Sequence, residues 1–540
     1  MNVLQKHWSI VALILIVGVG AFLRLYTLGS VPSGLYIDEV AIGVDALSLA
    51  ATGRDMHGGL WLTSVFPSYG DYKLPVYVWL AAVSVRVFGA TDFAVRLPSA
   101  LAGIATIMLV YALALEVFAK EKQGKLIAVL SAAMVAIMPW SILFSRAGFE
   151  AHVGQAFVLA SAWIALLAKK RLWLLSLSSV LGAIAVYSYF SVRFVFPVVL
   201  IGIFLFRFEK KHWKKQFLFY VGCLTLFALL IVPMANSPYY APMQSLRFST
   251  KNILDNTDVV AETNRLRELG GNSAVARLLF HRDFFMAKEF ARHFADHLNF
   301  SYLFVSGDIN LRHSTRETGI LLFGMLPAFM VGLFTLARKH KKLSCVFLLW
   351  YLAALVPASV PYDTPHALRS LNALGVLGLI LGVGAAEITV KLWQGSLFKI
   401  VLLSGLAVFL AANFFSFWHD YLHHYPQRST AAWAETRKEL GLFIRDQKNR
   451  YDKIQIAADD RLFLWFIWYG GFDIQDVQRA PSVAYIKPVF ANIVFHPLSK
   501  VSWDWNRSLV IGPSTEMETV LNSHVIVTSS LEAFSYVEIR

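Results

Sequence analysis

Cysteine is scarce in this chain of 540 residues, which contains only Cys223 and Cys345. Both lie inside apolar runs, so the sequence offers neither a disulfide framework nor the paired spacing of a zinc site. It also lacks the glycine-rich GxxxxGK[ST] and GxGxxG segments that hold nucleotide phosphates. ATP-driven transport and nucleotide-sugar donors therefore have no support.

Charged residues are also few, at 16% of the chain, whereas hydrophobic residues make up 57%. A soluble protein of this length cannot bury so much apolar surface, and we therefore predict a polytopic α-helical membrane protein. The net charge of +14 comes from short basic clusters between apolar runs. That distribution is typical of membrane orientation signals and gives no indication of nucleic-acid binding.

Apolar runs long enough to cross a bilayer, about 20 residues each, recur along the first 415 residues. The first run lacks an obvious cleavage site, and we interpret it as an uncleaved span. We predict about eleven transmembrane helices, near residues 8–28, 97–118, 126–144, 151–168, 172–189, 192–207, 216–234, 319–337, 343–360, 370–390 and 398–415.

The apolar run 74–88 is only 15 residues long and is interrupted by Arg86. If it does not cross, every dense basic cluster falls on one side of the membrane, as the positive-inside rule requires. We therefore predict an amphipathic helix lying at the outer face. The N-terminus is then cytoplasmic and the C-terminal part extracytoplasmic, in a multi-pass protein of the plasma (inner) membrane.

This topology gives a transmembrane domain over residues 1–415 and a soluble outer domain over 416–540. The transmembrane domain carries two long outer loops, 29–95 and 235–318, and the second has helical patterning around 273–298. The tail combines a helical pattern over 430–447 with strand-like runs at 453–459 and 524–530, so we expect a mixed α/β fold. The aromatic run 461–471 is expected either in its core or on a membrane-facing surface, and not as a platform for sugar.

Polar residues that can carry chemistry gather on the predicted outer side. Asp38 and Glu39 form an acidic pair about ten residues after the first span, where unpaired charge is costly. Short outer loops add Arg146, Glu150, His152, Arg193, Asp363, His366 and Arg369. Carboxylates beside basic groups suit a substrate that has an anionic headgroup and a hydroxyl to be deprotonated. For each single residue, ordinary interfacial snorkelling and pairing is the alternative.

Five segments match, in order, the motifs of one known family: GLYIDEVAIGVDALSLAATGRD, SYGDYKLPVYVWL, FAVRLPSALAG, PWSILFSRAGFEAH and PHALRSLNALG. Together they make residues 8–400 resemble the protein-mannosyltransferase-like branch of the GT-C glycosyltransferases, which includes protein O-mannosyltransferases and the lipid A aminoarabinose transferase. The resemblance implies a GT-C-type fold with outer juxtamembrane helices in the first loop. It also implies an inverting hexosyltransferase that moves a mannose-like or other sugar from a polyprenyl-phosphate donor to an acceptor hydroxyl. The acceptor stays open between protein, lipid and glycan, and no nucleic acid is expected.

The resemblance also implies roles for individual residues. Asp38 leads the acidic motif of the first loop and is expected to be catalytic, with Glu39 beside it and Glu150 as a further acid. Lys73 stands where relatives have the lysine of a KPP motif that contacts the lipid phosphate. The remaining candidates for binding the donor phosphate or substrate are Arg146, Arg193, His366, Arg369 and Arg24, of which Arg24 is equally well explained by snorkelling.

The sequence does not show whether the reaction requires a metal ion. No cofactor is evident, and a divalent cation is the one candidate, with Asp38 and Glu150 as its ligands if it is used. His419 and His423 have the i, i+4 spacing of a metal-binding pair, but no third ligand is evident. The family-like stretch 302–319 adds Arg312 and His313 without a defined role.

Two other functional classes remain open. A transporter or flippase for a lipid-linked glycan should show broken helices and charges near the bilayer midplane, whereas here the charges gather at one end of the predicted spans. A noncatalytic binder of glycolipid would differ from the enzyme only in its lack of activity.

Overall fold

The computed structural model describes residues 3–169, 171–248, 253, 257–394, 396–458, 460–483, 486–501, 507–514, 517, 528–531 and 534–539. The chain divides into two compact units. Unit 1 comprises Met1–Tyr26 and Ser99–Tyr425, and unit 2 comprises Thr27–Pro98 and Pro426–Arg540. The boundary predicted at 415 separates the tail from everything before it, whereas in the structure the first outer loop groups with the tail.

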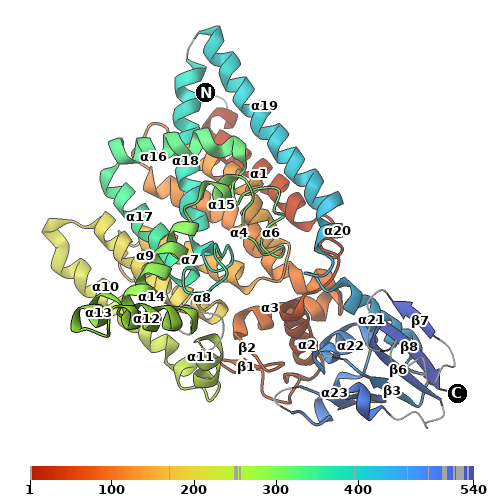
Figure 1. Ribbon diagram of the computed structural model, residues 1–540. Coiled ribbons are helices and arrows are strands. Elements are labelled where there is room, and N and C mark those ends of the chain that lie inside the picture. The colour runs from red at the N-terminus through yellow and green to blue at the C-terminus, as the bar shows by residue number, and fades with distance from the viewer. Residues whose placement is uncertain are drawn as a thin grey trace. The chain divides into compact units, whose positions relative to one another are not determined.

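Unit 1 is built around a helical bundle (Figure 1). Each of the eleven predicted spans coincides with a helix or, in one case, with a bent pair of helices. They are α1 (Val3–Leu25), α4 (Asp92–Val117), the pair α5 (Gly124–Ile137) and α6 (Pro139–Ser145), α7 (Glu150–Leu167), α8 (Leu174–Ser188), α9 (Val192–Arg207), α10 (Trp213–Ala235), α16 (Leu326–Lys339), α17 (Lys341–Leu355), α18 (Leu374–Trp393) and α19 (Leu397–His419).

Among the described residues, seven helices are long and apolar enough to cross a membrane, and the pair α5–α6 makes an eighth candidate. That pair bends by 58° at Met138, which is extended because the residue before a proline disfavours the α conformation. The remaining predicted spans, α8, α9 and α16, are helices of 15, 16 and 14 residues. The polytopic helical fold is confirmed, and the count of eleven crossings depends on these three short helices.

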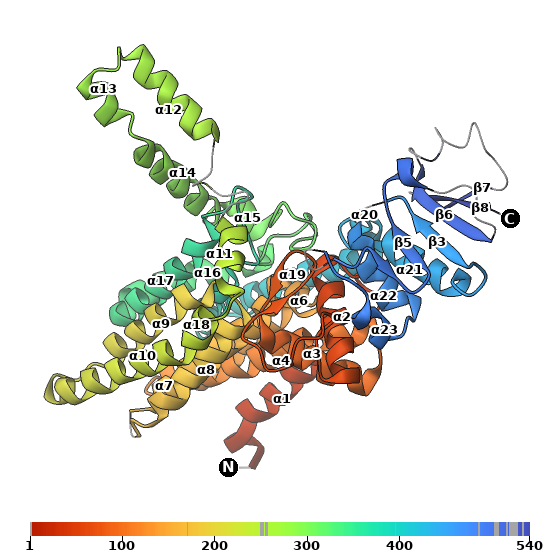
Figure 2. The ribbon, with the colours of Figure 1, turned by 90° about the horizontal axis from the view of Figure 1, so that it is seen from below.

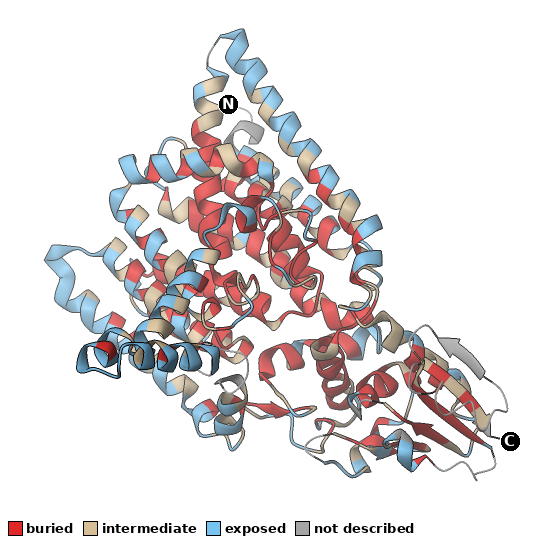
Figure 3. Cartoon of the chain, in the orientation of Figure 1, coloured by how far each residue is buried: buried red, intermediate tan, exposed pale blue. Residues whose placement is uncertain are grey.

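Close packing around α18 forms the centre of unit 1. A side chain at Gly382 would collide with Ser131 of α5, and one at Gly384 with the Ala328 carbonyl of α16. Figure 3 shows buried residues along the inner faces of the bundle, while α19 is largely exposed. The exposed face of α19 is apolar, with Leu397 and Phe398 at 77% and 75% exposure, which suits contact with lipid.

The described residues of the long loop between α10 and α16 form five α-helices, two of which, α13 and α14, cover the helical patterning predicted around 273–298. They are α11 (Tyr240–Phe248), α12 (Thr257–Leu269), α13 (Ala274–Leu279), α14 (Arg282–Asp296) and α15 (Phe300–Phe304). Figure 2 shows α12, α13 and α14 as a hairpin that projects from the rest of unit 1.

Unit 2 contains the first outer loop and the tail. The loop forms α2 (Ile37–Thr52), the two-stranded ribbon β1 (Phe66–Pro67) and β2 (Tyr72–Lys73), and α3 (Pro75–Phe88), the helix predicted over 74–88. The tail helices are α20 (Tyr425–Ser429), α21 (Glu435–Gln447), α22 (Phe463–Gly470) and α23 (Ile474–Arg479).

The tail also forms a mixed six-stranded sheet of order β4-β5-β3-β6-β8-β7, in which β3 runs parallel to β5 and β6. Its strands are β3 (Lys453–Ile456), β4 (Val489–Phe490), β5 (Ile493–Phe495), β6 (Ser508–Pro513), β7 (Thr528–Leu531) and β8 (Phe534–Ile539). The mixed α/β tail is therefore confirmed. Of the strand-like run 524–530, residues 524–527 lie outside the described residues.

The buried aromatic helix α22 explains why the first loop belongs with the tail. The indole nitrogen of Trp465 donates to the carbonyl of Leu35 at 3.0 Å. Lys438 pairs with Asp92 at 2.8 Å and donates to the Ser33 carbonyl at 3.0 Å. Periodicity within either segment carries no signal of these bonds, because their partners are more than 340 residues apart.

Candidate functional site

In unit 2, Asp38 is bonded to a lysine and a tyrosine. It lies in the first turn of α2, where the helix dipole favours a carboxylate. Its Oδ1 accepts a hydrogen bond from the Tyr69 hydroxyl at 2.6 Å and pairs with the Lys73 ammonium. Lys73 also pairs with Asp71, at 3.0 Å between Nζ and Oδ2. The cluster thus holds one cation between two carboxylates.

Burial differs sharply within this cluster. The Lys73 side chain is only 3% exposed, whereas those of Asp38 and Asp71 are 34% and 23% exposed. Burial, followed by the charge of Asp38, raises the pKa of Tyr69 well above its ordinary value, so Tyr69 stays a neutral donor. Asp38 is therefore a partly exposed carboxylate that accepts from Tyr69 and pairs with Lys73.

The ribbon β1–β2 positions these donors. Lys73 pairs with Phe66 in its register, and Gly70 takes the positive φ of 83° in the connecting turn. The sequence interpretation singled out Lys73 but not Tyr69 or Asp71. Strand alternation gave no signal for them, because Tyr69 and Asp71 lie in the turn that connects β1 and β2 and not on either strand.

The second acid of the pair, Glu39, has a different environment. Glu39 is fully buried and pairs with buried Arg96 at 3.0 Å. Arg96 also donates to the backbone carbonyls of Leu28, Pro32 and Gly34, and its guanidinium lies over the Trp433 ring. Glu39 therefore neutralises the cation that holds together the chain segment leading into α2.

In unit 1, Arg24 is buried, and its guanidinium forms hydrogen bonds only with other parts of the protein. Its five N–H groups reach the carbonyls of Gly20, Ala136 and Val135 and the hydroxyls of Ser145 and Ser141. The guanidinium thus satisfies carbonyls that the α5–α6 break leaves open. In this arrangement Arg24 has no N–H left for a donor phosphate.

Arg146 also binds the first helix, α1, through its last carbonyl groups. It donates to the carbonyls of Leu23 and Tyr26 at 3.0 and 2.7 Å, and so caps the C-terminal end of α1. Its Nε donates to the Tyr421 hydroxyl at 3.2 Å, and its guanidinium lies over the Trp418 and Tyr421 rings. Glu150 begins α7 and is half-buried.

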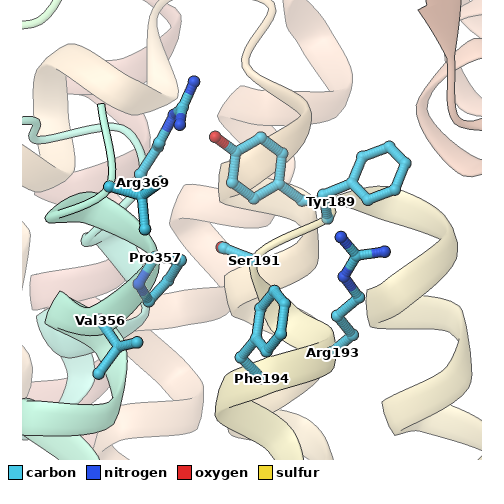
Figure 4. A pocket seen from close by; sticks show the side chains of 9 residues that line it. Tyr189, Ser191, Arg193, Phe194, Val356, Pro357 and Arg369 are labelled. Carbon is cyan, nitrogen blue, oxygen red and sulfur yellow. The ribbon is translucent and has the colours of Figure 1, made fainter. Parts of the chain in front are cut away.

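Arg193 and Arg369 line one pocket of about 220 Å³. Figure 4 shows Arg193 with Tyr189, Ser191 and Phe194 on one side, and Arg369 with Val356 and Pro357 on the other. Arg193 donates to the Tyr240 hydroxyl and to Gln244, both at 3.2 Å. The pocket combines two cations with a mainly apolar wall.

His366, the last predicted site residue, lies beside Asp308 and His313. The His313 and His366 ring centroids are 5.1 Å apart. Burial alone would raise the pKa of Asp308, but His313 and then His366 hold it below its ordinary value. Burial, with the nearby charges of His313 and Arg369, lowers the pKa of His366 well below its ordinary value, so its imidazole is neutral.

The predicted site residues therefore fall into both units. Asp38, Glu39 and Lys73 belong to unit 2, while unit 1 holds Glu150, Arg24, Arg146, Arg193, His366 and Arg369. Asp38 and Lys73 are brought together, as are Arg193 and Arg369. Sequence reasoning missed Tyr69, Asp71, Arg96 and Asp308.

Solved structures share the fold of the chain. ArnT from Cupriavidus metallidurans in the apo state matches with a TM-score of 0.56 at 12% identity, over 99% of this chain and 98% of that one. The same protein bound to undecaprenyl phosphate also gives 0.56 at 12% identity, over 98% of each chain.

The oligosaccharyltransferase of Archaeoglobus fulgidus, tethered with an acceptor peptide, matches with a TM-score of 0.55 at 14% identity. That match covers 86% of this chain but only 63% of the other, so the chain spans less than two thirds of its length. The archaeal oligosaccharyltransferase AglB from the same organism, in complex with an inhibitory peptide and a dolichol-phosphate, gives 0.56 at 13% identity, over 96% and 71% of the two chains.

Sequence comparison adds one family. No protein with a curated description matches the chain. Residues 72–235 match the family model of the dolichyl-phosphate-mannose-protein mannosyltransferases, a segment that begins one residue before Lys73. Together with the structural matches, this segment shows that the chain is a membrane protein of the GT-C fold in which residues 72–235 are similar to the dolichyl-phosphate-mannose-protein mannosyltransferases.

Proposed function

We propose that the protein is an inverting glycosyltransferase that uses a polyprenyl-phosphate sugar. The observation that carries this proposal is the pairing of Lys73 with Asp38, a carboxylate with 34% of its side chain exposed. Structural relatives bind such carriers: ArnT was solved with undecaprenyl phosphate, and AglB with a dolichol-phosphate. The sugar and the acceptor remain open.

The proposed mechanism assigns a task to each group. Asp38 removes the proton from the acceptor hydroxyl, whose oxygen attacks the anomeric carbon on the face opposite the phosphate. The bond between the anomeric carbon and the phosphate oxygen breaks, and its electron pair leaves with the phosphate. Because this group departs as a stable anion, no general acid is needed. Lys73 stabilises the departing charge at short range.

The other cations divide into two groups. Arg24 and Arg146 are used in holding α1, so we leave them out of the donor site. Arg193 and Arg369 line a pocket whose apolar wall suits a lipid carrier, and we propose them as further donor contacts. Glu150 stays a proposed third carboxylate, which would bind a divalent cation with Asp38 if the reaction requires one.

We further propose that the reaction takes place at the outer face of the plasma membrane. The basic clusters at one end of the unit 1 helices favour a cytoplasmic location for that end. Asp38 follows Tyr26 by 12 residues, and the Tyr26 carbonyl is bound by Arg146 at the opposite end of the bundle. This orientation assigns the loop that carries Asp38, which follows α1 in the sequence, to the outer side.

Sugar transfer by the reconstituted protein, with a panel of polyprenyl-phosphate sugars, tests the proposal. We expect Asp38→Asn to slow transfer about 10²–10⁴-fold at saturating donor, as loss of a general base does. Asp283→Asn is the matched control, because it removes a carboxylate that is 73% exposed from a different loop. Near wild-type transfer by Asp38→Asn would remove Asp38 from catalysis.

The α5–α6 break bears on the rival transporter function, since transporters build ion sites from the open carbonyls of broken helices. Here the carbonyls of Val135 and Ala136 both accept from Arg24, so they are not available to a transported cation. Because Arg24 already binds these carbonyls, the break favours an enzyme over a transporter. Donor binding by the wild-type protein without transfer to any acceptor would instead indicate a noncatalytic binder.

A further inference from the structure

Two loops of unit 1 bring three potential metal ligands together. Asp308 and His313 belong to the loop after α15, and His366 belongs to the loop before α18. One ligand atom from each residue lies within 4.8 Å of the other two. Small side-chain rotations therefore suffice to bring the three atoms to one ion.

The carboxylate of this cluster is fixed by backbone donors. Asp308 Oδ1 accepts from the Asn310 N–H at 2.8 Å, and Oδ2 accepts from the Ala367 N–H, also at 2.8 Å. His313 Nδ1 lies 2.9 Å from the same Oδ2. The Asp308 and His313 side chains are only 3% and 7% exposed. The carboxylate thus joins the two loops in a fixed position.

Without a metal ion, Asp308 and His313 still satisfy each other by a hydrogen bond, but His366 gains no partner from this pair. His366 Nδ1 is buried and has no hydrogen-bond partner within the described part of the chain. Leaving a buried polar nitrogen unsatisfied costs stability, so such an atom calls for an explanation. A bound cation supplies a partner for this nitrogen and for the carboxylate together.

We propose that Asp308, His313 and His366 bind a divalent metal ion of the zinc class. Two imidazole nitrogens and one carboxylate oxygen suit zinc and similar transition metals, whereas magnesium and calcium prefer sets made of oxygen atoms. Three protein ligands leave one coordination position for water or an anion. These residues differ from the pair Asp38 and Glu150, and the proposal does not depend on the glycosyltransferase activity.

The surroundings fit a metal site. The rings of Phe144 and Phe149 lie 5.7 and 5.8 Å from that of His313 and shield it with apolar surface. The backbone N–H of His366 donates to His297 Nε2 at 2.9 Å, and His297 Nδ1 donates to the His293 carbonyl at 2.8 Å. This chain of bonds fixes the loop that carries the third ligand.

Zinc binding by the full-length protein in detergent tests the proposal. Calorimetry on the chelated and dialysed protein, titrated with zinc alone, should detect one tight site per chain. After zinc is restored and the excess is removed, elemental analysis should find about one zinc ion per chain. His366→Gln and Asp308→Asn should each weaken binding more than about 100-fold, because even changes around the ligands cost about 10–100-fold. The His419→Gln, His423→Gln double variant is the matched control, since it removes a histidine pair at helical spacing from another part of the chain.

A second measurement keeps the test decisive if a variant does not fold. The absorption spectrum of cobalt bound to the wild-type protein should show a low-coordinate site with nitrogen and oxygen ligands. No zinc retention by the wild-type protein would overturn the proposal. So would zinc binding that the His366 and Asp308 variants leave unchanged, or that only the control variant removes.

Discussion

Asp38 and Glu39 are neighbours in the sequence but lie in different surroundings. Adjacent residues of a helix point in different directions, so one carboxylate of the pair is 34% exposed while the other is fully buried. The exposed acid, Asp38, pairs with Lys73 and accepts a hydrogen bond from Tyr69. The buried acid, Glu39, pairs with Arg96. The two residues should therefore differ in what their substitution changes.

We expect Glu39→Gln to affect stability more than chemistry. The substitution leaves the buried guanidinium of Arg96 without its counter-charge, and breaking a buried ion pair costs about 3–5 kcal/mol. Denaturant unfolding should show a lower midpoint for Glu39→Gln, while Asp38→Asn should unfold close to the wild type. Equal unfolding midpoints for Glu39→Gln and the wild type would show that Arg96 does not need this charge.

Lys73→Ala should weaken binding of a polyprenyl phosphate. Hydrogen bonds to charged groups contribute about 1.5–3 kcal/mol, which corresponds to roughly a 10–150-fold loss of affinity. Lys73→Arg should recover part of the loss, because it keeps the charge but not the point-like geometry. Arg86→Ala is the control, since Arg86 is a more exposed cation of the same loop. Unchanged affinity in Lys73→Ala would remove Lys73 from the donor site.

At the scale of the element, α2 carries a second buried acid, Asp45, whose Oδ2 has no partner among the described residues. Burial, followed by the charge of Asp55, raises the pKa of Asp45 well above 3.8. As pH rises above about 4, the unfolded state releases this proton while the folded state keeps it, so stability falls.

We therefore expect Asp45→Asn to raise the unfolding temperature at pH 7 and to raise it less at pH 4. Thermal unfolding across this range measures the difference, and Asp363→Asn is the control for loss of an exposed carboxylate. An unfolding temperature that Asp45→Asn lowers equally at both pH values would mean that the ionised form is accommodated.

The elements show what sequence reasoning can and cannot predict. Apolar run length located a helix at every predicted span, and alternation located β3 within 453–459, because both patterns are local. The role of Arg24 was not predictable, since the carbonyls and hydroxyls that it binds in α5 and α6 are more than 110 residues away. Glu39 and Arg96 are separated by 57 residues, and no periodicity links them.

At the scale of the whole molecule, unit 2 combines segments from both ends of the chain. Trp465 is fully buried and bonds to the Leu35 carbonyl, so Trp465→Ala should lower stability by about 3–5 kcal/mol. Transfer activity should fall as well, because α2 would lose its support. Trp393→Ala, at a side chain 67% exposed, is the control. Unaltered unfolding and transfer in Trp465→Ala would show that α2 holds its position without the tail.

Membrane orientation can be tested directly. We expect Gln123, in the basic loop between α4 and α5, to be cytoplasmic. With Cys223 and Cys345 replaced, a cysteine at 123 should react with an impermeant reagent only in permeabilised cells, while one at 363 should react in intact cells. Labelling at position 123 from outside would overturn the proposed topology.

The composition of unit 2 also has a consequence for biosynthesis. Residues 27–98 leave the ribosome more than 300 residues before the tail that completes their unit. At about 5–20 residues per second, the first loop waits on the order of tens of seconds for its partner. The packing of α2 against the tail helix α22 can therefore form only when synthesis is nearly finished. An incomplete chain would then present Asp38 on a loop that lacks the buried Trp465 beneath it.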